Sequence, residues 1–265
     1  MKKICITIFC AFFATAVFCQ DTLTSYFDAS WKETTADNFQ FYRKKVKKEN
    51  VWAVVDYYKS GKLQMKGSFL DDSCKKQQGE FLWYDETGSL SREDHFTDGK
   101  SDGRQAYYYP NGKAKMVGSN KMDKKDGEWT AYYESGKISG KAMYKNDKQI
   151  SAIFFKEDGS PNNQISEFEK ESEYPGGVAA LSEFLSKHLR YPDKALKNNT
   201  QGTVVVQFIV DKDGSVTDVQ VAKGVDPLLD EEAVRVIKKM PKWQPAIQGG
   251  RQVKSYKKQP IAFRF

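Results

Sequence analysis

Residues that commonly carry catalysis or hold metal ions are scarce in this sequence. Its 265 residues include only two histidines and four cysteines. His95 lies in a turn-rich stretch and His188 lies on an apolar helical stripe, so the two belong to different regions and form no pair. The sequence has no zinc-ligand spacing, phosphate-binding loop or nucleophile elbow. We therefore expect a protein that is not an enzyme, with no catalytic residue, metal or cofactor.

Cysteines are almost absent after the N-terminal segment. Cys5, Cys10 and Cys19 all fall within the first 19 residues, which leaves Cys74 alone in the rest of the chain. A single cysteine cannot form an internal disulfide. Cys74 has lysines beside it but no suitable histidine partner, which favours a tolerated surface thiol over a nucleophile.

Long hydrophobic runs are also lacking, apart from one at the N-terminus. Two lysines precede the apolar run 4–19, which is shorter than the roughly 20 residues that cross a membrane. This pattern is typical of an export signal, residues 1–19, cleaved near the A-x-A pattern at 14–16 or between Cys19 and Gln20. We expect a periplasmic protein, with an uncleaved membrane anchor and a lipid anchor as the alternatives.

The sequence has no strong excess of one charge and no proline-rich tract. Lys and Arg number 42 against 35 Asp and Glu, giving +7, or +5 without the two lysines of the export signal. Basic residues are spread over both halves of the chain, so it lacks the polybasic body that grips DNA. We expect no nucleic-acid partner.

One local cluster of positive charge stands out, because no acidic residue follows Glu232. A solvated surface is one interpretation, and a contact for an acidic receptor segment or an anionic envelope polymer is the other. The basic residues that gather toward the final segment are Lys238, Lys239, Lys242, Arg251, Lys254, Lys257 and Lys258.

The middle of the chain is an internal repeat. Gly79, Gly103 and Gly127 are spaced 24 residues apart, and degenerate copies begin at Val51 and Ser151, which gives about five units. Each unit has an aromatic run, a turn such as Asn-Gly or Ser-Gly, and a second run, as β-hairpins do. One hairpin cannot bury its aromatic side chains alone. We therefore expect serial antiparallel hairpins that stack on one another.

This stretch, residues 51–161, resembles MORN-type repeats in their bacterial form, G-x-W-x-x-Y-Y-x-x-G-K. The resemblance implies a surface that binds proteins or lipids, and the alternative is a spacer whose aromatic residues only pack. Five aromatic side chains are expected to face one shared apolar layer: Trp83, Tyr84, Tyr108, Trp129 and Tyr133.

A second domain is expected at residues 174–265, after an acidic linker at 162–173. Its periodicities are those of a mixed α/β domain. The Asp211–Gly214 segment lacks the spaced oxygen ligands and closing glutamate of a calcium loop, so we interpret it as a turn. The expected order is helix, strand, strand, helix, strand, at residues 181–189, 203–210, 215–222, 226–240 and 260–265.

The same region resembles the C-terminal domain of TonB, in the form common in Bacteroidetes. The resemblance implies an α+β fold whose small antiparallel sheet captures the TonB box of outer-membrane receptors, a short extended peptide, as an added strand. It is specific because several anchors occur in order at suitable spacing. These anchors are YPGG from Tyr174, RYPDKA from Arg190, QGTVVVQFIVDKDGSV from Gln201, LDEEAVRVI from Leu229, MPKWQP from Met240 and the terminal PIAFRF.

The resemblance also implies a peptide-binding site. It places the docking edge in the last strand and the captured peptide near the Tyr-Pro pair. Pro260 suits an edge strand because it has no N–H to donate to a ladder. The implied peptide-binding residues are His188, Arg190, Tyr191, Pro192, Pro260, Ile261, Ala262, Phe263, Arg264 and Phe265.

Two features of an energy-transducing TonB protein are not found in this sequence. The N-terminal apolar run has no evident motor-contact pattern, and repeats replace the Pro-rich spacer, since only eight prolines occur. We therefore interpret the protein as a periplasmic adaptor that recognises envelope proteins, expected to be TonB-dependent receptor segments, with or without a part in transmembrane transport. The alternative is a structural scaffold whose MORN-like array is the main binding surface. The sequence leaves open whether the protein is a monomer or a homodimer.

Overall fold

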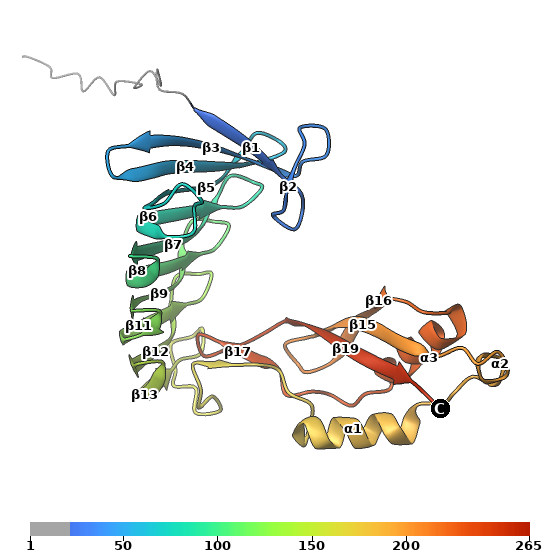
Figure 1. Ribbon diagram of the computed structural model, residues 1–265. Coiled ribbons are helices and arrows are strands. Elements are labelled where there is room, and N and C mark those ends of the chain that lie inside the picture. Colours follow the sequence, from blue (N-terminus) through green and yellow to red (C-terminus); the bar gives the residue numbers. More distant parts are fainter. Residues whose placement is uncertain (1–21) are drawn as a thin grey trace, which may run out of the picture. The chain divides into compact units, whose positions relative to one another are not determined.

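The structure is a computed structural model that describes residues 22–265 (Figure 1). The predicted export signal, residues 1–19, lies outside the described residues. The chain divides into two compact units, one ending at Lys100 and one beginning at Ser101. Within residues 22–265, every helix is too short or too polar to span a bilayer.

The first unit consists of antiparallel strands that pair in the order β2-β1-β3-β4-β5-β6-β7. Serial pairing begins before the first repeat found in the sequence. Strand β1 pairs with β3, and β3 pairs with β4 across a turn at Glu49 and Asn50 that has no glycine. The strands are β1 (Leu23–Phe27), β2 (Glu33–Thr34), β3 (Phe41–Lys48), β4 (Val51–Tyr58), β5 (Leu63–Phe69), β6 (Gln77–Tyr84) and β7 (Leu90–Thr97).

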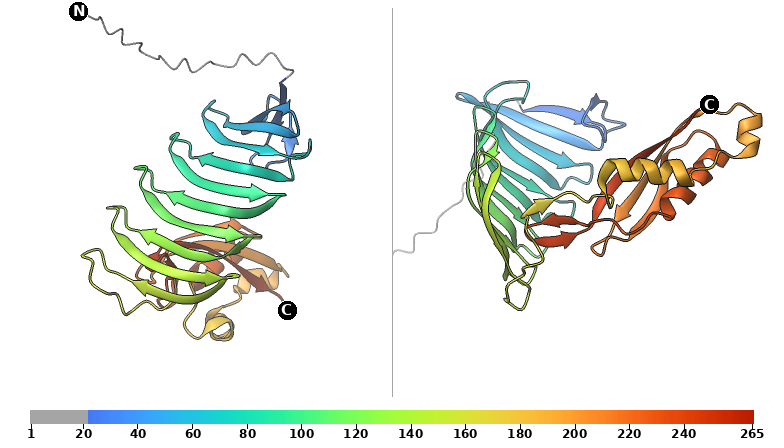
Figure 2. Two further views of the ribbon diagram at one scale, coloured as in Figure 1. Left: turned by 90° about the vertical axis from the view of Figure 1, so that its left-hand side faces the viewer. Right: turned by 90° about the horizontal axis from the view of Figure 1, so that it is seen from below.

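The second unit begins with further hairpins of the same kind (Figure 2). Their strands pair in the order β8-β9-β11-β12-β13, with the short β10 beside β9. The predicted serial antiparallel hairpins are therefore confirmed. The strands are β8 (Lys100–Tyr108), β9 (Ala114–Lys121), β10 (Lys124–Lys125), β11 (Gly127–Tyr132), β12 (Ile138–Lys145) and β13 (Lys148–Phe154).

Hydrogen bonds between successive turns explain the Y-x-x-G-K part of the repeat. A tyrosine hydroxyl donates to a carbonyl of the next repeat, at 2.8 Å in each case, from Tyr58 to Tyr84, Tyr109 to Tyr132 and Tyr133 to Phe155. The lysine after the turn glycine does the same from Lys62 to Glu86, Lys113 to Ser135 and Lys137 to Glu157. These bonds link neighbouring hairpins within each unit.

Each unit buries an aromatic cluster between its hairpins. Phe81 in the first unit and Trp129 in the second are both 0% exposed. A Cβ added to Gly67 would lie 2.4 Å from the Phe81 ring, and one added to Gly118 would lie 2.1 Å from the Trp129 ring. A glycine on the preceding hairpin therefore provides the space that each buried ring fills.

The expected shared layer of five aromatics forms only in part. Trp83 packs against the Phe81 cluster and Trp129 is at the centre of the other, whereas Tyr84, Tyr108 and Tyr133 belong to neither. Adjacent residues of a strand face opposite sides of the sheet, so Trp83 and Tyr84 do not share a face. The paired aromatics of the motif thus have separate roles.

The segment expected to be a linker, residues 162–173, packs on the last hairpin. Phe168 is fully buried, and its ring lies edge-on to Tyr144. The Phe168 N–H donates to Gln149 Oε1 at 2.8 Å. The strand β14 (Glu169–Lys170) follows at once. This segment caps the final hairpin, as the end units of repeat proteins require.

The remainder of the second unit has the predicted order of helices and strands, with additions. A short helix α2 follows α1, and a hairpin, β17–β18, precedes the last strand, which begins at Ser255 instead of Pro260. The α+β fold class is confirmed. The elements are α1 (Gly177–His188), α2 (Asp193–Lys197), β15 (Gly202–Val210), β16 (Val216–Lys223), α3 (Pro227–Lys238), β17 (Ala246–Gln248), β18 (Arg251–Val253) and β19 (Ser255–Phe263).

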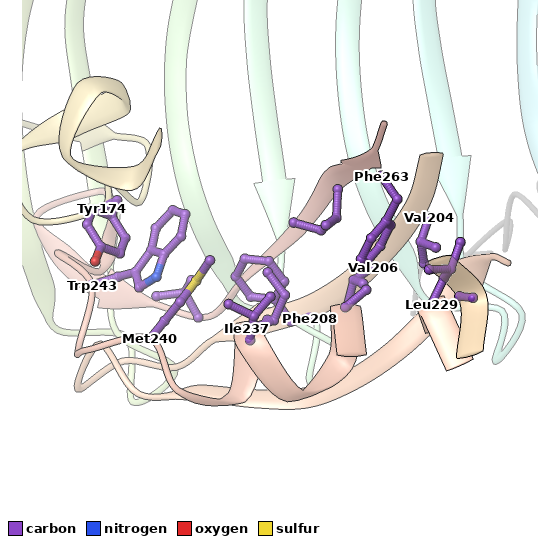
Figure 3. Packing of buried hydrophobic residues seen from close by; sticks show 14 residues of the cluster. Tyr174, Val204, Val206, Phe208, Leu229, Ile237, Met240, Trp243 and Phe263 are labelled. Atoms are coloured by element: carbon purple, nitrogen blue, oxygen red, sulfur yellow. The ribbon is translucent and has the colours of Figure 1, made fainter. Parts of the chain in front are cut away.

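Strands β16, β15 and β19 form an antiparallel sheet with β15 in the centre. One face of this sheet carries the core shown in Figure 3, in which Phe208 of β15 lies edge-on to Trp243. A Cβ added to Gly214 would lie 2.1 Å from the Trp243 carbonyl oxygen. The Asp211–Gly214 segment is thus a tight turn packed against the core. Residues 22–265 contain no cluster of side chains suited to a metal ion.

Candidate functional site: the edge of the C-terminal sheet

Strand β19 forms one edge of the sheet β16-β15-β19. It pairs with β15 from Ser255 to Phe263 without a register shift. Within residues 22–265, no strand pairs with the other side of β19. A long regular edge has a row of backbone donors and acceptors that another strand can satisfy.

The position of Pro260 indicates which backbone groups face this free edge. Pro260 lies opposite Val205 in an unbroken ladder. A proline fits there only where its nitrogen points away from the partner strand. Backbone groups alternate along an antiparallel strand, so Lys258 and Ala262 also direct their N–H and C=O groups outward. The residues with these outward backbone groups have their side chains on the open face of the sheet. Ile261 and Phe263, which alternate with them, are buried on the core face.

The opposite edge, β16, is less suited to adding a strand. Its pairing with β15 shifts register twice, and Asp218 has a φ of 49°. Bulges of this kind twist an edge and interrupt its row of hydrogen-bonding groups. The geometry therefore favours β19 as the edge that can accept a peptide.

The predicted residues after α1 lie at the end of β19. The Tyr191 ring packs edge-on against Phe263, with centroids 5.6 Å apart, and stacks on Phe265 at 5.2 Å. The Tyr191 hydroxyl donates to the Thr200 carbonyl. Pro192 is the N-cap residue of α2. The structure thus brings Tyr191 and the C-terminal end of β19 together.

His188 and Arg190 are exposed at the end of α1. The His188 ring stacks on Phe184 at 4.2 Å, and its Nδ1 lies 2.8 Å from the Phe184 carbonyl oxygen. These local contacts leave the imidazole at the surface, and it has no acidic or nucleophilic partner among the described hydrogen bonds. Its contacts are those of a residue at a helix end.

A partly buried ion pair on α3 holds this segment in place. Glu232 accepts from Arg235 through both carboxylate oxygens, at 2.6 Å each, and from the Arg190 N–H at 2.7 Å. Arg235 Nη2 donates to the His188 carbonyl at 2.7 Å. The backbone on both sides of the α1 terminus is therefore fixed by two side chains of α3. Neither residue stands out in the sequence, because their spacing is that of an ordinary helical salt bridge.

Glu232→Gln is expected to lower the free energy of unfolding by about 1.5 to 3 kcal/mol, the range for hydrogen bonds to charged groups. Burial acts to raise the pKa of Glu232, but the hydrogen bonds from Arg235 and the Arg190 N–H outweigh it, so the pKa lies below its ordinary value of 4.5. A lowered pKa means that the carboxylate contributes stability above the unfolded-state pKa, and that this contribution is lost as the pH falls through the folded-state value.

Urea unfolding at neutral and acidic pH measures this effect. The wild type should lose more stability on acidification than Glu232→Gln does, because only the wild type has this carboxylate to protonate. Glu231→Gln is the matched control, since Glu231 is the exposed neighbour on the same helix. Equal acid dependence in wild type and Glu232→Gln would contradict the assignment.

The open face of the sheet carries an exposed tyrosine beside β19. Tyr256 is 83% exposed and borders a hollow of about 750 Å³ that Gln207, Gln220 and Lys258 also line. Gln207 lies directly opposite both Gln220 and Lys258 in the sheet. A strand added along β19 would extend this face. Sequence reasoning missed Tyr256, because it lies before the apolar alternation that begins at Pro260.

Three lysines of the basic cluster have acidic partners. Lys242 pairs with Asp213, Lys254 with Asp211 and Lys257 with Glu171, at 2.7 to 3.2 Å. Pairing reduces the positive charge that these residues present to solvent. The solvated-surface interpretation of the cluster is favoured for these three lysines.

The first unit has a separate cavity of about 370 Å³. Its lining includes Trp31, Arg43, Trp83 and Cys74. Burial raises the pKa of the Cys74 thiol, although Arg43 and Lys45 oppose this shift. A raised pKa keeps the thiol protonated, so Cys74 is not an activated nucleophile.

Comparisons with known proteins find two family models that match different parts of the chain. Residues 187–265 match the family model of the Gram-negative bacterial TonB protein C-terminal, and residues 77–98 and 125–146 match that of a MORN repeat variant. No curated protein matches the chain.

Two solution NMR structures of the Helicobacter pylori TonB C-terminal domain are similar to this region. One is 28% identical with a TM-score of 0.28, and covers 33% of this chain and 79% of that chain. The other is 29% identical with a TM-score of 0.27, and covers 33% of this chain and 91% of that chain.

Both matched families are types of binding or adaptor domain and not of enzyme, and TonB C-terminal domains belong to the Gram-negative cell envelope. The chain is therefore similar to TonB C-terminal domains over residues 187–265 and to MORN repeats within its serial hairpins.

Proposed function

We propose that this protein is an exported periplasmic adaptor that binds extended segments of envelope proteins along the free edge of β19. The observation that carries the proposal is the unbroken pairing of β19 with β15 from Ser255 to Phe263, with no strand on its other side within the described residues. Backbone hydrogen bonds would supply the affinity, and neighbouring side chains would supply the selectivity. The family resemblance favours TonB-dependent outer-membrane receptors as the source of these segments.

The arrangement of side chains supports the same edge. Tyr191, Phe263 and Phe265 form an aromatic group at one end of β19, and Tyr256 lies exposed toward the other end. A peptide added to the strand would run between these two aromatic positions. Such positions suit side chains of an extended peptide, which alternate between the two faces of a sheet.

Ala262→Pro is expected to weaken peptide binding by about tenfold or more, because it removes an outward-facing backbone donor. The donors that pair with β15 belong to the alternate residues and are unaffected. Ala262→Val is the matched control, since it enlarges the side chain but keeps the N–H. The measurement is an NMR titration of the full mature chain with a synthetic TonB-box peptide.

Amide shifts along β19 and around Tyr191 would support the proposal, provided that Ala262→Val binds as the wild type does. Circular dichroism would establish that both variants are folded. Shifts confined to the serial hairpins would instead favour the scaffold, in which the MORN-like array is the binding surface. The cavity beside Trp31 and Arg43 is the observation that supports this second function.

Export is tested on the native protein. The lysine-led apolar segment predicts a mature chain that begins near Val17 or Gln20 and is found in the periplasm. N-terminal sequencing and intact mass after cell fractionation measure both points. Recovery of the uncleaved chain in the inner membrane would refute cleavage and favour an anchored protein.

A further inference from the structure

The tip of the β17–β18 hairpin is inserted against the last repeats of the second unit. A Cβ added to Gly249 would lie 2.3 Å from the Ala131 Cβ, and one added to Gly250 would lie 2.3 Å from the Phe154 ring. Contacts under 3.0 Å cannot be accommodated without a shift. Glycine is therefore the residue that fits at these two positions, because any larger residue would strike a side chain of the repeats.

The repeats have a surface that matches the shape of the Gly249–Gly250 turn, and this surface is the seat of the hairpin. Aligned on their turn glycines, the repeats have Trp83 and Tyr107 at the position that Ala131 occupies. The small side chain of Ala131 leaves the space that the Gly249 turn fills. Ser139, which is fully buried, donates its hydroxyl to the Gly249 carbonyl at 2.8 Å. The repeat at this point thus departs from its neighbours where the hairpin enters.

Charged and polar groups complete the seat. Arg251 follows the glycine turn and donates to the Tyr109 hydroxyl, with its guanidinium 5.8 Å from the Tyr133 ring centre. The Gly250 N–H donates to the carbonyl of buried Phe168 at 3.2 Å. These contacts join the hairpin to the repeats and to the segment that caps them.

The seated hairpin is continuous with the proposed binding strand. Only Lys254 separates β18 from β19. Near the start of β19, the Ser255 hydroxyl donates to Ser172 Oγ at 2.7 Å, and Lys257 pairs with Glu171 at 3.0 Å. Both partners lie just after the cap of the last repeat. The start of β19 is therefore held from two sides by elements that contact the repeats.

We infer that the last MORN-like repeats are a docking surface for the Gly249–Gly250 turn of the same chain, and that this docking holds the first residues of β19 in place. The repeats of the second unit then act as a rigid support for the C-terminal sheet and not as a flexible spacer. Docking is a property of the unliganded chain, so the inference does not depend on peptide binding.

Gly249→Ala in the full mature chain tests the docking surface. We expect backbone amides of β17 and β18 to exchange with deuterium about tenfold faster or more than in wild type, because the hairpin opens locally when its seat is lost. Gly112→Ala is the matched control. Gly112 has a φ of 78° against 60° for Gly249, but a Cβ added to it meets nothing within 4 Å. It therefore carries similar backbone strain without the clash.

A compensating change separates docking from general damage. Ala131→Gly removes the atom that the new methyl group would strike, so Ala131→Gly with Gly249→Ala should return exchange to within about threefold of the Ala131→Gly variant alone. Ser139→Ala, which deletes one hydrogen bond without a clash, should raise hairpin exchange while far-UV circular dichroism stays unchanged. Equal exchange in Gly249→Ala and Gly112→Ala would overturn the inference, as would failure of the compensating change or of Ser139→Ala.

Discussion

Trp129→Ala is expected to lower the free energy of unfolding by about 3 to 5 kcal/mol, as truncation of a large buried aromatic side chain does. Trp129 is 0% exposed and is at the centre of the aromatic cluster of the second unit. Its Nε1–H donates to the Ser119 carbonyl at 3.1 Å, and Lys125 Nζ lies 4.7 Å from its ring centre. Gly118 faces the ring and has no side chain of its own to fill the space that Trp129→Ala leaves.

Urea unfolding followed by circular dichroism measures the change. Tyr256→Ala is the control, because Tyr256 is an equally aromatic but exposed residue of the same unit, and its truncation should cost less than about 0.5 kcal/mol. Similar losses for the two variants would mean that the repeats do not depend on the buried tryptophan.

Asp56→Ala is expected to cost about 3 to 5 kcal/mol, because it leaves a buried cation without its partner. Asp56 is 1% exposed, and its two oxygens accept from Arg43 Nε and Nη2 at 2.7 Å each. The Arg43 guanidinium lies 5.4 Å from the Phe27 ring centre and 5.8 Å from that of Phe69. Only 17% of the Arg43 side chain is exposed, so solvent replaces the lost carboxylate only in part.

Two comparisons isolate the buried pair in the same unfolding measurement. Asp72→Ala removes the carboxylate of the Lys45–Asp72 pair, in which Asp72 is mostly exposed, and should cost no more than about 1 kcal/mol. Arg43→Met with Asp56→Leu replaces both charges with apolar groups and should be less destabilising than Asp56→Ala alone. A double variant that loses as much stability as Asp56→Ala would show that the charges themselves, and not the unpaired cation, govern the loss.

Local chemistry explains why much of the fold could be predicted. The turn glycines repeat every 24 residues with aromatic runs between them, and each signal acts within one hairpin. Asp226 and Pro227 begin α3 as expected, with the Asp226 side chain accepting from the Leu228 N–H at 2.9 Å. The β3–β4 hairpin could not be predicted in this way, because its turn at Glu49 and Asn50 has no glycine.

The candidate site was predictable in outline but not in its supports. The terminal apolar alternation predicted a strand at Pro260–Phe265, but the strand begins at Ser255 and ends at Phe263. Its first residues are polar and lysine-rich, so periodicity alone does not reveal that they pair with β15. Glu232 and Arg235, which fix the segment before Tyr191, act through partners more than 40 residues away.

The sequence by itself determined the hairpin repeats, the order of helices and strands after them, and the family resemblance, because turn preferences, periodicity and motifs are properties of neighbouring residues. The tertiary structure decided which backbone groups of β19 face outward and which face β15. It also decided that Gly249 meets Ala131 and that the presumed linker caps the last hairpin. These contacts join residues distant in the chain, so they depend on close packing between elements and leave no periodic signal in the sequence.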